Sequence, residues 1–146
     1  MDKTWYDCSI KYRKTTEEGS QKVITESYLI DAISFTEAES RINEKMSEFI
    51  SEEFIVSNIK LTNISEVHSF DNSERWFKAK VTLIAYDEAT GKEQKSNFYL
   101  LAEANDAKDA YTKTVEIMKT TMSDYSIPAI TETKIIEVFP FISKES

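Results

Sequence analysis

The sequence repeats itself at an offset of 71 residues, and this repeat constrains the fold more than any other feature. Identical residues coincide along the whole repeat: Trp5 with Trp76, Tyr28 with Tyr99, Leu29 with Leu100, Thr62 with Thr133, Glu66 with Glu137, Val67 with Val138 and Phe70 with Phe141. Only the stretch DNSE separates the copies, which span about 4–70 and 75–141. Because no long linker intervenes, we expect residues 1–146 to form a single domain with pseudo-twofold symmetry.

Each copy opens with two alternating runs around a glycine, which is the pattern of a β-hairpin. Gly19 and Gly91 are the two glycines of the chain, and each lies between such runs. Glycine supplies the positive φ that hairpin turns often require. Residues of one parity form the predicted apolar faces, namely Tyr6, Cys8, Ile10 and Tyr12 in the first copy, and Phe77, Ala79, Val81, Leu83, Phe98, Leu100 and Ala102 in the second.

One amphipathic helix follows each predicted hairpin. Ser34 and Glu37 have the spacing of a capping box. The Ser34 side chain can accept from the backbone N–H of Glu37, and the Glu37 carboxylate can reach back to the start of the helix. Helical spacing then places apolar residues on one stripe: Phe35, Ala38, Ile42, Met46, Phe49 and Ile50. The second helix is expected to begin at Asn105 or Asp106, with Ala107, Ala110, Tyr111, Thr114, Met118 and Met122 on its stripe.

The end of each copy is rich in β-branched and aromatic residues and is too long for one strand. We expect breaks near Thr62–Asn63 and Thr133–Lys134, and edge or irregular backbone at Pro128 and Pro140. The predicted fold class is therefore α+β, with tandem duplicated ββαββ units that form antiparallel sheets and two helices in one domain.

Composition limits where and how the protein acts. No window approaches the roughly 18 apolar residues of a membrane span, so we expect a cytoplasmic protein without membrane contact. Cys8 is the only cysteine, which excludes an intrachain disulfide and a cysteine-based zinc cage. The net charge of −8 opposes non-specific attraction to nucleic acid, although a local basic face remains compatible with it.

Catalytic and cofactor motifs are missing from the sequence. His68, the only histidine, shares a predicted strand face with Glu66, but these two ligands fall short of a zinc site. A Cys8–His68 pair would need a long-range contact, and the repeat-matched Glu66 and Glu137 fit structural roles better than acid catalysis. With both glycines in hairpins, no phosphate-binding loop can be written. We therefore predict no catalytic residue, metal or cofactor, and a non-enzymatic protein.

The two tryptophans carry the remaining functional signal. Each lies on the parity opposite the apolar face, together with basic residues, so that the candidate binding residues are Trp5, Lys11, Arg13, Trp76, Lys78 and Lys80. Aromatic and basic side chains on an exposed strand suit single-stranded nucleic acid. Residues 3–24 hold five basic and three acidic side chains, whereas residues 34–53 hold two and six. Alternatively, the tryptophans pack within the fold or at a homodimer interface.

The stretches YLIDAISFTEAE and EVFPF carry a family resemblance that extends over nearly the whole chain. Together with WYDCSIKYRK, they resemble an uncharacterised family of Bacteroides-type bacteria and their phages. The resemblance implies no catalytic or binding residues. The leading hypothesis is a protein that binds single-stranded nucleic acid through the Trp and basic strand faces. The alternative is a protein-interaction or regulatory module that holds a small ligand at a repeat or dimer interface.

Overall fold

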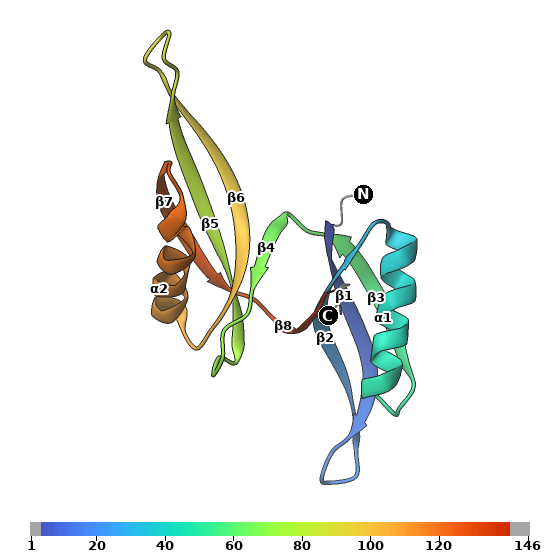
Figure 1. Ribbon diagram of the computed structural model, residues 1–146. Helices are drawn as coiled ribbons and strands as arrows, with labels where there is room; N and C mark the ends of the chain where they lie inside the picture. Colours follow the sequence, from blue (N-terminus) through green and yellow to red (C-terminus); the bar gives the residue numbers. More distant parts are fainter. Residues whose placement is uncertain (1–3, 141–146) are drawn as a thin grey trace. The chain divides into compact units, whose positions relative to one another are not determined.

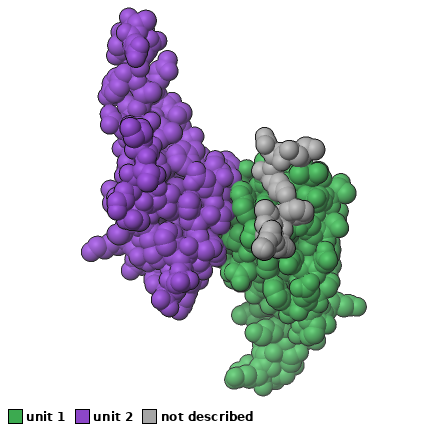
Figure 2. All heavy atoms as spheres, viewed as in Figure 1, with its two compact units in different colours: residues 1–62, 134–146 green, residues 63–133 purple. Residues whose placement is uncertain are grey.

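The computed structural model describes residues 4–140, and the expected match between Phe70 and Phe141 lies partly outside this range. The chain divides into two compact units (Figure 2), with residues 1–62 and 134–146 in unit 1 and residues 63–133 in unit 2. Each unit contains one four-stranded sheet and one α-helix. The α+β class and the ββαββ order of each repeat are therefore confirmed, while a single domain stays a prediction.

Unit 1 places one helix against a sheet with the strand order β3-β1-β2-β8 (Figure 1). Its strands are β1 (Thr4–Thr15), β2 (Gln21–Ala32), β3 (Phe54–Leu61) and β8 (Ile135–Phe139), and its helix is α1 (Phe35–Phe49). The β1–β2 hairpin extends past the end of α1, as Figure 1 shows. The distal part of this hairpin is therefore left uncovered by the helix.

Unit 2 has the same plan, with the strand order β4-β6-β5-β7. Its strands are β4 (Ile64–His68), β5 (Arg75–Tyr86), β6 (Glu93–Ala104) and β7 (Asp124–Glu132). The helix α2 (Ala107–Ile117) is shorter than α1 and continues into the 3-10 helix η1 (Met118–Thr120). The duplication thus preserves the architecture but not the length of the helix.

The last strand of each repeat belongs to the sheet of the other unit. β3 ends at Leu61 and β4 begins at Ile64, and β7 and β8 are separated at 133–134, so both predicted breaks are confirmed. β8 pairs with β2, and β4 pairs with β6, each in parallel, which makes the sheets mixed rather than wholly antiparallel. The strand that joins each sheet from the other repeat runs parallel to its neighbour, and the alternation of residues along the sequence cannot predict this direction.

Two repeat-matched threonines, Thr62 and Thr133, are the last residues before the chain passes from one unit to the other. The hydroxyl of Thr62 donates to the carbonyl of Trp5 at 2.8 Å, and the N–H of Thr62 donates to the same oxygen at 3.0 Å. Thr133 makes both bonds to the carbonyl of Trp76, at 2.8 and 2.9 Å. Each bond pair lies within one unit and fixes the residue from which the chain leaves. The matched threonines therefore have a structural role.

The predicted turn and cap residues adopt the expected geometry. Gly19 has φ 88° and Gly91 has φ 71°, as hairpin glycines require. Ser34 accepts from the N–H of Glu37 at 3.1 Å, and the Glu37 carboxylate accepts from the N–H of Ile33 at 2.8 Å. In unit 2 the N-cap is Asp106, which was one of the two predicted starts. Local chemistry alone set these features.

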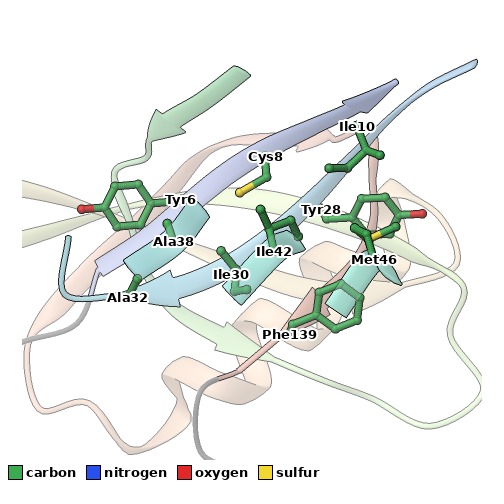
Figure 3. Packing of buried hydrophobic residues seen from close by; sticks show 10 residues of the cluster. All are labelled: Tyr6, Cys8, Ile10, Tyr28, Ile30, Ala32, Ala38, Ile42, Met46 and Phe139. Atoms are coloured by element: carbon green, nitrogen blue, oxygen red, sulfur yellow. The ribbon is translucent and has the colours of Figure 1, made fainter. Parts of the chain in front are cut away.

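Alternation predicts the faces of the hairpins well, and helical spacing predicts the helix stripes only in part. The unit 1 core contains Tyr6, Cys8, Ile10, Tyr28, Ile30, Ala32, Ala38, Ile42, Met46 and Phe139 (Figure 3). Ala110, Thr114 and Met118 are the buried residues of the second stripe. Phe35 and Phe49 are exposed at the two ends of α1, and Tyr111 and Met122 are exposed in unit 2. The predicted stripes were thus too wide, because in each unit only three positions spaced four residues apart are buried: Ala38, Ile42 and Met46 in unit 1, and Ala110, Thr114 and Met118 in unit 2.

The ladder registers correct two of the seven matched pairs. Cys8 lies opposite Tyr28, and its repeat partner Ala79 lies opposite Leu100. Tyr28 therefore corresponds to Leu100 and Leu29 to Leu101, not to Tyr99 and Leu100. The turn between β5 and β6 spans 87–92, one residue longer than the turn at 16–20, which shifts the second strand and the helix by one position.

Candidate functional site

The face of each sheet opposite its helix holds the predicted binding residues. In unit 1, Trp5 is half-buried, whereas Lys11 and Arg13 are exposed. In unit 2, Trp76 is only 4% exposed and Lys78 and Lys80 are half-buried. The structure thus brings Lys11 and Arg13 together near the hairpin tip of unit 1, and it buries the tryptophan side chain of unit 2.

An open groove of about 980 Å³ lies at the distal end of the unit 1 sheet. Its lining comes from the β1–β2 hairpin and from the start of β3: Lys11, Tyr12, Arg13, Thr15, Gln21, Val23, Glu52, Glu53, Phe54 and Ile55. On the face opposite the helix, Lys11 lies between Thr25 and Ile55, and Arg13 lies beside Val23. The groove therefore combines basic groups with an aliphatic floor.

The basic and aliphatic residues of this groove are available to a ligand. Val23 is 56% exposed and Ile55 is 61% exposed. Within residues 4–140, Lys11 and Arg13 make no hydrogen bond or ion pair with another side chain. Exposed aliphatic groups beside unpaired cations favour a ligand that is both apolar and anionic. Glu52 and Glu53 add negative charge at the side of the groove that β3 forms.

The corresponding surface of unit 2 has different chemistry. Thr82 and Ile84 stand where unit 1 has Lys11 and Arg13, and Ser126 stands where unit 1 has Ile55. The hydroxyl of Thr82 donates to Asn97 Oδ1 at 2.7 Å. Lys95, the cross-strand neighbour of Ile84, forms a 3.7 Å ion pair with Glu93. The polar groups of this surface therefore bind one another.

The cations of unit 2 that the sequence singled out have partners or limited exposure. Lys78 Nζ lies 4.8 Å from the centre of the Tyr99 ring, within the range of a cation–π interaction. Lys80 is half-buried opposite Tyr99 on the same face. The ammonium groups of Lys78 and Lys80 are therefore less available to an anionic ligand than the charged groups of Lys11 and Arg13. The groove of unit 1 is the stronger candidate site.

The acidic residues and the histidine that were considered for catalysis or metal binding lie in two different units. His68 Nε2 lies 2.9 Å from Glu66 Oε1 in β4 of unit 2, and Glu137 lies in β8 of unit 1. Between residues 4 and 140, no three His, Cys, Asp or Glu side chains gather closely enough to hold a metal ion. No helix in the same range is long and apolar enough to cross a membrane.

Burial suppresses the acidity of two groups in the unit 1 core. Burial, with a smaller contribution from Asp7, raises the pKa of the Cys8 thiol from 9.0 to about 12. Burial and the hydrogen bond to Glu26 raise the pKa of Tyr28, whose hydroxyl lies 2.8 Å from Glu26 Oε1. The thiol is neutral at physiological pH, and a neutral thiol is a poor nucleophile.

Sequence analysis missed the groove residues that are not basic. Val23 and Ile55 lie on the parity opposite the buried face, and apolar residues at such positions were the available signal. The position of Glu53 and Ile55 beside β1 depends on long-range strand pairing, which spacing along the chain does not report. The groove therefore emerges only in three dimensions.

Comparison with known proteins assigns the chain to a family of unknown function. No curated protein and no solved structure is significantly similar to the chain. Residues 4–141 match a family that is described as Domain of unknown function (DUF4494). The match covers both repeats, including the groove residues and both exchanged strands. The chain belongs to this family, Domain of unknown function (DUF4494).

Proposed function

We propose that the chain is a non-enzymatic binding protein and that the groove of unit 1 binds an extended segment of another protein. The observation that carries this proposal is the pair of unpaired cations, Lys11 and Arg13, beside the exposed side chains of Val23 and Ile55. An extended peptide presents side chains alternately to its two faces. A segment that alternates acidic and apolar residues would match this surface.

Size and charge support a peptide over a small metabolite. The groove is open and about 980 Å³, at the upper end of the range for small-molecule sites, and ligand pockets of that kind are normally enclosed. Glu52 and Glu53 at its edge oppose a polyanion and tolerate a peptide with mixed charge. We also propose that the protein forms a homodimer and acts in the cytoplasm. Its source, in this proposal, is a Bacteroides-type bacterium or one of its phages.

Selection from a displayed library of short random peptides tests the proposal. We expect the selected peptides to share acidic residues that alternate with apolar ones. Lys11→Ala and Arg13→Ala should each weaken binding of a selected peptide, as measured by fluorescence anisotropy. Lys14→Ala and Lys22→Ala are matched controls, because these two lysines face each other on the opposite face of the same hairpin. Equal losses in all four variants would contradict binding in the groove.

Single-stranded nucleic acid is the second candidate ligand. Lys11 and Arg13 are exposed two residues apart on one strand, and the half-buried Trp5 is an aromatic residue on the same face of that strand. Basic and aromatic groups together can hold a nucleic-acid backbone and stack its bases. The burial of Trp76 and the net charge of −8 favour the peptide instead.

Binding of labelled oligo-dT at low and moderate salt separates the two candidates. If nucleic acid binds, neutralising Lys11 and Arg13 should flatten the salt dependence of the binding constant. Trp5→Ala should then remove about 1–3 kcal/mol for the lost stack. No binding at low salt, where electrostatic attraction is strongest, would exclude this ligand and leave the peptide.

A further inference from the structure

We infer that β3 pairs with β3 of a second copy of this chain, antiparallel, so that two four-stranded sheets join at their edges. β3 is the outer strand of the unit 1 sheet and has eight residues. The second copy fits this edge through its backbone pattern, its cross-strand apolar pairs and its charges. The inference does not depend on which ligand the groove binds.

Among the sheet edges within residues 4–140, β3 is the one best suited to further pairing. β4 and β8 have only five residues each. β7 has nine residues but carries Pro128 at the position that matches Ser57 of β3. Proline on an edge strand opposes further pairing, and short strands offer few backbone groups. Ile55 and Leu61 of β3 are 61% and 53% exposed.

The backbone of β3 presents free groups along this edge. The N–H of Thr62 donates to Trp5, which fixes the residues whose backbone groups face β1. Alternation then turns the backbone groups of the neighbouring residues away from β1. Ser57 is the extra residue of a bulge, since Ser9 lies opposite Asn58 and Ile10 opposite Val56. The residues whose groups point outward are therefore Phe54, Val56, Ile59 and Leu61.

One antiparallel register satisfies the two copies of this edge. A twofold axis at Val56 places Val56 opposite Val56 of the second copy and Phe54 opposite Ile59. Both pairs join residues whose backbone groups point outward, and all three side chains are on the helix side of the sheet and half-buried. Apolar cross-strand pairs of this kind stabilise sheets.

The same register brings opposite charges together. Glu53 falls opposite Lys60 of the second copy, and the symmetry produces this pair twice. Both residues are exposed; Lys60 lies opposite Asp7 in the ladder, on the face opposite the helix, and Glu53 precedes β3 and lines the groove together with Lys11 and Ile55 of that face. Opposite charges directly across two strands stabilise the pair, and like charges destabilise it. Charge therefore selects this register over neighbouring ones.

Space for the second copy is present on the helix side of the edge. An open pocket of about 290 Å³ lies between α1 and β3, where Phe35, Val56 and Ile59 contribute to its lining. Phe35 is 54% exposed there. The outward-leaning apolar side chains of a second β3 would cover this pocket and reduce the exposed aromatic surface. No comparable feature is needed on the polar face.

Sedimentation velocity over a concentration series, with charge variants, tests the dimer. The wild type should dimerise as concentration rises. Glu53→Lys alone and Lys60→Glu alone should each raise the dissociation constant roughly tenfold, because each turns two attractive pairs into repulsive ones. The double variant with both changes should return toward the wild-type value. The matched changes in β7, Asp124→Lys and Thr131→Glu, should have no effect on dimerisation.

Amide hydrogen exchange identifies the strand that pairs. In the dimer, the N–H groups of Phe54, Val56 and Ile59 should gain protection, while the corresponding groups of Tyr125, Ile127 and Ile130 in β7 should not. A chain that stays monomeric at all concentrations would overturn the inference. A dimer without protection of these β3 amides, or a double variant that dimerises no better than the single ones, would overturn it as well. Peptide binding is measured separately on each variant, because Glu53 also lines the groove, whereas Lys60 does not.

Discussion

Unit 1 and unit 2 share one plan and differ in where they place polar groups. Unit 1 has Ile42 at the centre of its helix and Phe139 at the end of its exchanged strand, both buried. Unit 2 has Thr114 and His68 at the corresponding positions, and His68 is half-buried. Unit 1 thus has the more apolar core. The comparison shows that one duplicated architecture tolerates both kinds of centre.

The surfaces differ in the opposite sense. Lys11 and Arg13 of unit 1 lack partners among residues 4–140, while Thr82 and Lys95 of unit 2 are bonded to neighbours within their own sheet. Exposed charges that bind nothing internally contribute little to stability and remain available to a ligand. In the proposed function, unit 1 therefore provides the binding surface, whereas polar groups on the corresponding surface of unit 2 bind one another.

Removal of the aromatic anchor of β8 should have the largest effect on stability. The Phe139 ring stacks on Tyr28 at 5.7 Å and lies 5.5 Å from Phe49, measured between ring centres. Phe139→Ala should lower the free energy of opening of unit 1 by about 3–5 kcal/mol, because it removes a buried ring. Native-state hydrogen exchange of amides in β1 and β2 measures this change.

The matched control is His68→Ala in β4. His68 is partly exposed, and its Nε2 forms a surface hydrogen bond of 2.9 Å with Glu66 Oε1, so the cost should be about 1 kcal/mol or less. Equal destabilisation by the two substitutions would show that the exchanged strands are held in the same way, against the comparison.

The helix centres provide the second test. Ile42 is fully buried between α1 and the sheet, so Ile42→Ala should cost about 2–5 kcal/mol. Thr114 is also fully buried, but its hydroxyl bonds to the carbonyl of Ala110 at 2.7 Å and its side chain is smaller. Thr114→Ala should cost about 1 kcal/mol. Chemical denaturation compares the two, and an unchanged midpoint for Ile42→Ala would contradict the packing of α1.

Alkaline pH should destabilise unit 1 selectively. Burial raises the pKa of the Cys8 thiol to about 12 in the folded protein, from 9.0 in the unfolded chain. Between these values the unfolded chain has lost the proton and the folded chain keeps it, so stability falls as pH rises. Thermal unfolding at pH 10 should reveal a loss on the order of 1 kcal/mol relative to pH 8.

Cys8→Ala, which copies Ala79 of unit 2, should flatten this pH dependence. Tyr28→Phe should flatten it further at higher pH, since the pKa of Tyr28 is also raised. The corresponding residue in unit 2, Leu100, does not titrate. If hydrogen exchange shows both units weakening equally with pH, a source outside these two residues is required.

Much of the fold was predictable because it depends on local chemistry. The capping box at Ser34 and the turns at Gly19 and Gly91 involve neighbouring residues only, and both are confirmed. Alternation also predicted the buried face of each hairpin. The strand breaks at 62–63 and 133–134 followed from the length limit of a strand.

The exchange of β4 and β8 could not be predicted, because the sequence of a strand does not state which sheet it joins. Glu66 and Glu137 match in the repeat but belong to different units. The groove was missed in part for the same reason, since Ile55 reaches Lys11 only through long-range pairing. The turn between β5 and β6 has one extra residue, so a constant offset of 71 matched Tyr28 with Tyr99 instead of Leu100.

The smallest expected effects lie in the two hairpin turns. Both glycines have positive φ, and an added Cβ would meet no atom within 4 Å at either site, so the cost of substitution comes from the backbone alone. Gly19→Ala and Gly91→Ala should each cost about 1 kcal/mol, since an L-residue is disfavoured there.

Asparagine tolerates the left-handed region best near φ of about +57°. Gly91, at 71°, is closer to that value than Gly19, at 88°. Gly91→Asn should therefore be almost neutral, while Gly19→Asn keeps most of the cost. Denaturation midpoints of the four variants check this order, and a larger loss for Gly91→Asn than for Gly19→Asn would show that the longer turn of unit 2 is the stricter of the two.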